Sequence, residues 1–137
     1  MDQEETMPRV NFNDLEYDVD GLVLHEGVLF TGDAFELYPN GALESEDSYR
    51  MGRLHGIGRE YFPTGELKAE YGASNGVADG IRREWNAEGR LLKEEHYARG
   101  ILLKRLEPDE KGDLHVTFEL TPDHPNYQLL PAELRKQ

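Results

Sequence analysis

The sequence predicts an all-β fold, an extended antiparallel sheet of consecutive β-hairpins with irregular capping ends. The first observation is an internal repeat with a 24-residue period. The second is an alternation of apolar and polar residues on both sides of a glycine-containing turn inside each unit. The columns in register are Gly32, Gly56, Gly80; Gly41, Gly65, Gly89; Gly52, Gly76, Gly100; Leu43, Leu67, Leu91; Glu36, Glu60, Glu84; and Glu46, Glu70, Glu94.

The 137 residues fit a single domain, since domains cluster near about 100–150 residues. We expect three parts within it. Residues 1–21 are an acidic N-terminal segment, residues 22–103 hold the hairpin repeats, and residues 104–137 form a C-terminal cap. The caps would protect the open edges of a stacked sheet.

The second repeat unit is expected to form a β-hairpin. Strands are expected over 57–62 and 66–73, joined by Pro63-Thr64-Gly65. Proline presets the φ of a turn, and glycine supplies the left-handed residue that closes the loop. With Thr64 at the centre of the loop, Glu60 is expected opposite Lys68. Alternation predicts one buried face, Ile57, Arg59, Tyr61, Leu67, Ala69, Tyr71 and Ala73, and one solvated face, Gly58, Glu60, Phe62, Glu66, Lys68 and Glu70.

The ends are less regular. An additional hairpin is expected from strands at 22–25 and 28–31 around Glu26-Gly27, and residues 1–14 are expected to be frayed. After Gly100, strands are predicted over 101–106 and 114–121. Residues 121–131 read as irregular, and Pro131 could begin a short helix, because proline is favoured at the first helical position.

Charge and composition limit the possible functions. The net charge is −13, of which −6 falls in residues 1–20 and −5 in residues 21–52. This excess argues against nucleic acid or an anionic membrane as partner and leaves a basic protein partner open, although charge that only aids solubility is the alternative. There is no cysteine, no signal-peptide pattern and no apolar run that could span a membrane, so we expect a cytoplasmic protein.

No constellation for catalysis, cofactor binding or metal binding stands out. Glu16-x-Asp18-x-Asp20-Gly21 resembles the start of a calcium loop, but the twelfth position, which needs an acid, is Gly27. The five histidines show no metal-ligand spacing. The sequence therefore predicts a protein that is not an enzyme and has no cofactor; a small hydrolase acting through carboxylates stays an alternative.

Several segments carry a family resemblance. They are Gly-Val-Leu-Phe-Thr-Gly at 27–32, Leu-Tyr-Pro-Asn-Gly-Ala-Leu at 37–43, and Glu-Tyr-Phe-Pro-Thr-Gly-Glu-Leu-Lys at 60–68. This pattern resembles the MORN-repeat variant, and within it the bacterial YwqK-type antitoxin family, over about residues 22–103. The third unit departs from it, because it loses the proline and has Asn86 in the column of Tyr38 and Phe62. The resemblance implies an extended hairpin sheet and an immunity or antitoxin role beside a secreted toxin.

The predicted partner is a cognate toxin with a basic active-site cleft, of the kind that acts on nucleic acid or nucleotides. An acidic surface would steer to such a cleft and fill it. The expected contacts are Glu36, Glu44, Glu46 and Asp47 on the first hairpin, followed by Asp14, Glu16, Asp18 and Asp20. Which face of the sheet meets the partner is left open. The alternative function is a MORN-like scaffold or membrane-associated binding module with no toxin partner.

Overall fold

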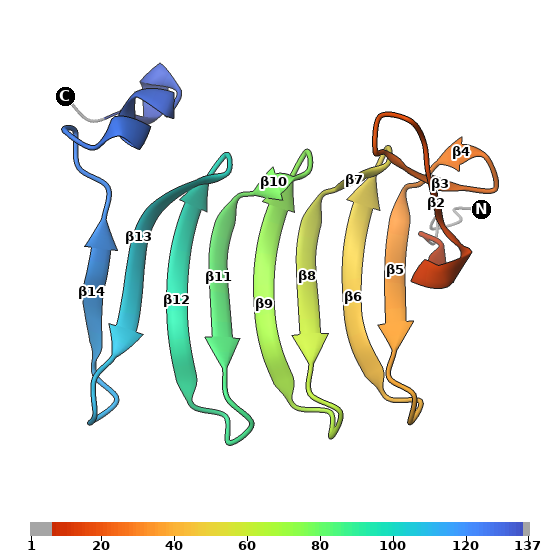
Figure 1. Cartoon of the computed structure of the whole chain (residues 1–137), viewed down its shortest axis with the longest axis horizontal. Helices are drawn as coiled ribbons and strands as arrows, with labels where there is room; N and C mark the ends of the chain where they lie inside the picture. Colours follow the sequence, from red (N-terminus) through yellow and green to blue (C-terminus); the bar gives the residue numbers. More distant parts are fainter. Residues whose placement is uncertain (1–6, 136–137) are drawn as a thin grey trace, which may run out of the picture.

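The computed structural model of the chain describes residues 7–135 and confirms the predicted all-β fold. An 11-stranded sheet runs the length of the molecule as a single row of strands (Figure 1). Three repeat hairpins form its centre: β5 (Gly32–Leu37) with β6 (Leu43–Arg50), β8 (Gly56–Tyr61) with β9 (Leu67–Ser74), and β11 (Gly80–Trp85) with β12 (Leu91–Ala98). Two further strands, β13 (Ile101–Pro108) and β14 (Leu114–Glu119), continue the row, and short β7 (Arg53–Leu54) and β10 (Val77–Ala78) pair with β6 and β9.

The loops at one end of the hairpins have the predicted turn. In the first loop Gly41 N donates to Tyr38 O at 2.9 Å, and Gly41 has a φ of 89°. The third hairpin makes the same turn without proline. There the Asn86 side chain accepts hydrogen bonds from the backbone N–H groups of Glu88 and Arg90, which stabilises the turn in place of the ring.

The turns at the opposite end link each repeat to the one before it. Three non-glycine residues with φ near 50° begin these turns, Met51, Asn75 and Arg99. Their backbone N–H groups donate to side chains 20 residues earlier, which are Thr31, His55 and Asp79. His55 therefore has a structural part in a turn, in line with its position before a repeat glycine.

A β-bulge corrects the predicted register of the second hairpin. Glu60 pairs with Ala69 and Tyr61 with Leu67, so Lys68 is the extra residue and the expected pairing of Glu60 with Lys68 is wrong. The bulge also reverses the predicted faces of β8. Gly58 and Glu60 share the face of Ala69 and Tyr71, whereas Ile57 and Arg59 lie on the opposite side; Ile57 is 51% exposed and Gly58 is buried.

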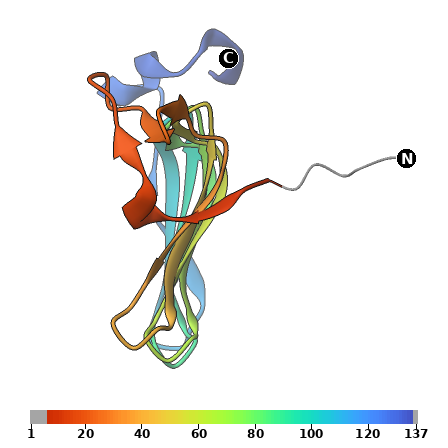
Figure 2. The ribbon, with the colours of Figure 1, turned by 90° about the vertical axis from the view of Figure 1, so that its right-hand side faces the viewer.

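The N-terminal segment caps the β5 end of the sheet. β1 (Arg9–Asn11) pairs with β5 in parallel and is followed by a 3-10 helix, η1 (Phe12–Asp14), so the prediction of fraying is wrong for residues 9–14. Residues 1–6 lie outside the described part. The predicted hairpin around Glu26-Gly27 is confirmed, but it belongs to a separate three-stranded sheet of β2 (Glu16–Tyr17), β3 (Val23–His25) and β4 (Val28–Leu29). Figure 2 shows these elements crossing the end of the row.

The main apolar core lies where this small sheet meets the first hairpin. Val23, Phe30 and Ala34 are buried there, and Tyr49 packs against them. A stacked sheet buries little elsewhere, and Ala69 is one of few other buried apolar residues in the described part. The N-terminal segment therefore supplies much of the packing that a single-layer array lacks.

The C-terminal segment folds back over the other end. The strands predicted there are confirmed as β13 and β14. Two 3-10 helices follow, η2 (Pro125–Leu129) and η3 (Ala132–Leu134), where the sequence suggested an irregular stretch and one short helix from Pro131. Tyr127 in η2 and Leu130 directly after it are buried. In residues 7–135, no helix has the length and apolar character needed to cross a membrane.

Candidate partner-binding site

An acidic groove lies on one face of the sheet between the first and second hairpins. It has a volume of about 300 Å³. We call this side of the sheet the groove face. The groove is lined by Glu36, Tyr38, Glu44, Ser45, Asp47, Glu60, Tyr61, Lys68 and Tyr71. Four carboxylates therefore face one ammonium group, a formal charge of −3 in a confined space.

Strand register brings these carboxylates together. Glu36 pairs with Ser45, and Ser45 pairs on its other side with Glu60, so the two glutamates are two strands apart on one face. At the usual strand spacing this separation is about 10 Å. The remaining charged groups of the lining are Asp47 and the two bulge residues, Glu44 and Lys68, which the register leaves without a direct partner in their hairpins.

Asp47 is partly buried in the groove and hydrogen-bonded there. Its Oδ1 accepts a 2.6 Å hydrogen bond from the Tyr71 hydroxyl. Burial raises the pKa of Asp47, the Tyr71 hydrogen bond opposes that rise, and the charges of Glu60 and Glu46 add to it. Burial also raises the pKa of Tyr71, followed by the bond to Asp47, so the phenol remains a donor. Gly58 makes the contact possible, because a Cβ there would lie 2.3 Å from both Asp47 Oδ1 and the Tyr71 ring.

The single cation of the groove does not neutralise it. Lys68 Nζ lies 5.8 Å from the centre of the Phe62 ring, and across residues 7–135 none of the ion pairs involves Glu36, Glu44, Asp47 or Glu60. Tyr38 helps to fix the rim, since its hydroxyl donates to the Tyr61 carbonyl oxygen at 2.6 Å. The groove thus has a hydrogen-bonded rim and a net negative charge.

The third hairpin carries carboxylates on the same face, but there they are paired. Glu84 contacts Arg82 Nε at 2.8 Å and Lys93 Nζ at 3.4 Å. Burial acts to raise the pKa of Glu84, but the hydrogen bond and charge of Arg82, together with Lys93, outweigh it and the pKa is lowered. Glu95 is only 4% exposed and pairs with Arg105 at 2.9 Å. This part of the groove face is therefore electrically balanced.

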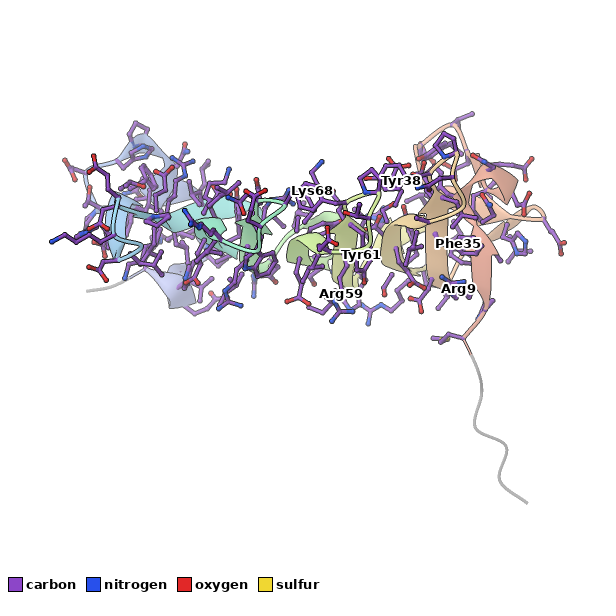
Figure 3. All side chains as sticks on the ribbon, turned by 90° about the horizontal axis from the view of Figure 1, so that it is seen from below. Arg9, Phe35, Tyr38, Arg59, Tyr61 and Lys68 are labelled. Atoms are coloured by element: carbon purple, nitrogen blue, oxygen red, sulfur yellow. The ribbon has the colours of Figure 1, made fainter. Side chains whose placement is uncertain are left out.

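The opposite side of the sheet, which we call the arginine face, is also balanced. Cross-strand pairs repeat along it, Arg59 with Glu70 at 2.6 Å and Arg83 with Glu94 at 2.9 Å. The first hairpin has Phe35 in the arginine column. Arg9 from β1 supplies the missing charge: it contacts Glu46 at 2.7 Å, and its guanidinium carbon lies 4.2 Å from the centre of the Phe35 ring. Figure 3 shows Arg9, Phe35 and Arg59 on one side of the ribbon and Tyr38 and Lys68 on the other.

The structure divides the predicted partner-binding residues into three groups. Glu36, Glu44 and Asp47 line the groove. Glu46 lies on the arginine face and is paired with Arg9. The remaining four belong to the N-terminal cap, Asp14, Glu16, Asp18 and Asp20, and none of them lines the groove.

Of those four, Asp18 has a local role in its turn. Its Oδ1 accepts hydrogen bonds from the N–H groups of Asp20 and Leu22, both at 2.9 Å. The sequence-based prediction did not include the other six lining residues; among them, it assigned Glu60 to a solvated repeat column and Tyr71 to the buried face. The signal that could have found Glu60 is its place in the same glutamate column as Glu36. Among residues 7–135 no group of three or more histidine, aspartate and glutamate side chains is arranged to hold a metal ion.

Comparison with known proteins supports the repeat assignment. Residues 54–71 match the MORN repeat variant, so the chain carries a MORN-type repeat in its second hairpin. This segment includes four groove residues, Glu60, Tyr61, Lys68 and Tyr71. No curated protein matches the chain.

Proposed function

We propose that this protein is a binding module without catalytic activity, and that its acidic groove receives a basic surface of a protein partner. The observation that supports this most is the lack of compensation in the groove. Three hairpins share one backbone, yet in the groove between the first two hairpins four carboxylates face one cation, Lys68, and none of the four is in an ion pair within residues 7–135. One of them, Asp47, has its pKa raised by burial. A partner cation would lower the cost of holding that charge away from water.

The partner class that we propose is a bacterial toxin domain with a basic active-site cleft. The support is the resemblance to YwqK-type antitoxins together with the charge of the groove. The protein would act as an immunity protein or antitoxin by covering the cleft. The acidic N-terminal cap, with −6 in residues 1–20, would increase the association rate through long-range attraction.

The test takes a toxin domain from the coding sequence next to this gene if that sequence contains one. Affinity is measured by calorimetry at low and high salt, and rescue from toxicity is measured in cells. The test variant is Glu36→Gln/Glu60→Gln. The control, Glu88→Gln/Glu110→Gln, removes the same charge from exposed loop positions. We expect the groove variant to lose about tenfold or more in affinity, about 1.4 kcal/mol, with a weaker salt dependence, while the control keeps both.

The two parts of the proposal fail separately. Equal affinities of the two double variants for the toxin domain would show that the groove is not the surface that contacts it. An unaltered protein that neither binds the domain nor rescues cells would exclude the immunity role and leave the groove for another basic partner.

A second candidate is a scaffold or membrane-associated module, and the MORN repeat match is the observation that favours it. Co-sedimentation with vesicles containing anionic phospholipid at low salt distinguishes this candidate from the first. The net charge of −13 predicts no binding, because the surface and the lipid repel each other. Binding to these vesicles would favour the membrane-associated module over the toxin-binding module.

A further inference from the structure

The last strand of the array, β14, has an uncovered outer edge. It pairs with β13 on one side, and no other described strand pairs with it (Figure 1). The chain that follows turns back over the array instead of shielding this edge. Glu133 reaches Arg99 in the turn between β12 and β13 at 3.5 Å, and Leu130 and Leu134 line a pocket with Leu103 of β13. An exposed strand edge of this kind is a ready template for pairing with another chain.

The hydrogen-bond pattern identifies which backbone groups are available. Leu120 N donates to Leu103 O at 2.8 Å, so these two residues form a hydrogen-bonded pair of the antiparallel ladder. Glu119 pairs with Lys104 at the next position, which is a non-hydrogen-bonded pair. The N–H and C=O groups of Glu119 therefore point away from β13 toward the open edge.

A bulge at Thr117 interrupts β14, and bulges often protect an edge. In this fold the bulge does not prevent pairing. The strands β6 and β9 have the same bulge, at Glu44 and Lys68. Each still receives the next hairpin through the two residues that follow its bulge, Ser45 and Glu46 in β6 and Ala69 and Glu70 in β9. Phe118 and Glu119 hold that place in β14, so β14 ends where the array would accept another strand.

At the other end of the sheet, the outer edge of β5 is already paired. β1 occupies the outer edge of β5, and Asp33 N donates to Pro8 O at 2.9 Å. The contact is close enough that a Cβ on Gly32 would lie 2.4 Å from Pro8 O. The outermost strand at that end is the three-residue β1, so the six-residue β14 offers the longer free edge, and the symmetric arrangement for two copies is a two-fold pair of β14 strands.

The charge distribution also favours association at the β14 end of the sheet. Residues 1–52 carry −11 of the net −13, whereas β14 contains one acid, Glu119. The first hairpin is separated from β14 by six strand spacings, about 30 Å, well beyond a screening length of about 8 Å at physiological salt. Two copies joined at β14 would keep their acidic ends apart.

We propose that two copies of this chain associate through antiparallel pairing of their β14 strands, centred near Phe118 and Glu119, to form one continuous sheet. This inference does not depend on the function proposed for the groove. It leaves both acidic grooves free, one toward each end of the dimer.

Sedimentation equilibrium of the full chain from low to high micromolar concentration tests the pairing. We expect a rise toward twice the chain mass of 15.7 kDa. Glu119→Pro removes the outward N–H, and Glu119→Ala is the matched control that keeps it. The alanine variant should associate like the unaltered protein, and the proline variant should stay monomeric with an unchanged circular dichroism spectrum.

A monomer at every concentration of the unaltered protein would overturn the proposal, as would a proline variant that dimerises equally well. If the proline variant does not fold, Thr117→Lys, at an exposed edge position, replaces it with the same expectation. Amide exchange gives a second readout. The Glu119 N–H should exchange more slowly as concentration rises, and a concentration-independent rate would contradict the pairing.

Discussion

The groove face differs between the first two hairpins and the third, although the backbone repeats. Three columns make the difference, and each changes residue type along the array: Ala34, Gly58, Arg82; Ser45, Ala69, Lys93; and Asp47, Tyr71, Glu95. The third hairpin has a cation in two of these columns, and its carboxylates are paired. The first two hairpins have small residues there, and the groove keeps its charge.

The comparison shows that some repeat columns hold the backbone and others set the local charge. The glycine columns and the turn hydrogen bonds hold the backbone and vary little. The three variable columns set the local charge, although several of their members are buried, among them Ala34, Gly58, Ala69 and Glu95. The array therefore presents different local charge on one repeated backbone.

The largest expected effect is at Gly58, the smallest residue of its column. Gly58→Ala would place a methyl group 2.3 Å from both Asp47 Oδ1 and the Tyr71 ring, so their hydrogen bond must shift. We expect a loss of about 1–3 kcal/mol in the free energy of unfolding, as for overpacked sites, measured by urea denaturation.

Ala34 has a methyl group in the first hairpin at the same column, which shows that the backbone itself accepts one. A control with Asp47→Ala in the same chain should recover part of the loss at Gly58. A change below about 0.5 kcal/mol for Gly58→Ala alone would show that the two side chains adapt without cost.

The fold could be predicted because a repeat multiplies weak local signals. The 24-residue period identified the hairpins and their turns, but the alternation rule failed at the bulge, where one extra residue exchanges the faces of a strand. The apolar–polar alternation of the sequence around Lys68 does not mark that bulge. The order of residues 9–14 could not be predicted either, because it depends on pairing with β5, which is distant in sequence.

The candidate site could be predicted in part. The excess of acids before Arg53 pointed to Glu36, Glu44 and Asp47, which do line the groove. Glu46 was included because neighbouring acids look alike in a sequence, but alternation sends its side chain to the other face, where Arg9 neutralises it. That partner could not be foreseen, since Arg9 replaces an arginine that the repeat lacks at Phe35.

The second largest expected effect comes from giving the first hairpin the cation that the third hairpin has in the same column. Ser45 pairs with Glu36 as Lys93 pairs with Glu84, so Ser45→Lys should place an ammonium group beside Glu36. We expect partner affinity to fall about fivefold to tenfold and its salt dependence to weaken, because one groove charge is neutralised before binding. Calorimetry at two salt concentrations measures both. Ser45→Ala is the control, and an equal loss in that variant would assign the effect to the hydroxyl group.

The smallest effect is a difference in pH dependence between two carboxylates. Burial raises the pKa of Asp47 in the folded state, so its ionised form costs stability at neutral pH, and that cost disappears as pH falls and the group is protonated. The pKa of Glu84 is lowered, mainly because Arg82 outweighs the effect of burial. Its contribution is therefore present above its ordinary pKa of 4.5 and is lost as pH falls through the folded-state value.

The variants Asp47→Asn and Glu84→Gln should consequently change stability in opposite directions at neutral pH. Asp47→Asn should leave the free energy of unfolding equal or higher, since the amide oxygen still accepts from the Tyr71 hydroxyl. Glu84→Gln should lower it by less than about 1 kcal/mol, because Glu84 is partly exposed. Urea denaturation at neutral pH and at about pH 3.5 measures both, and the two differences should shrink in acid. A loss of equal size in both variants would show that the groove carboxylate is as well compensated as that of the third hairpin.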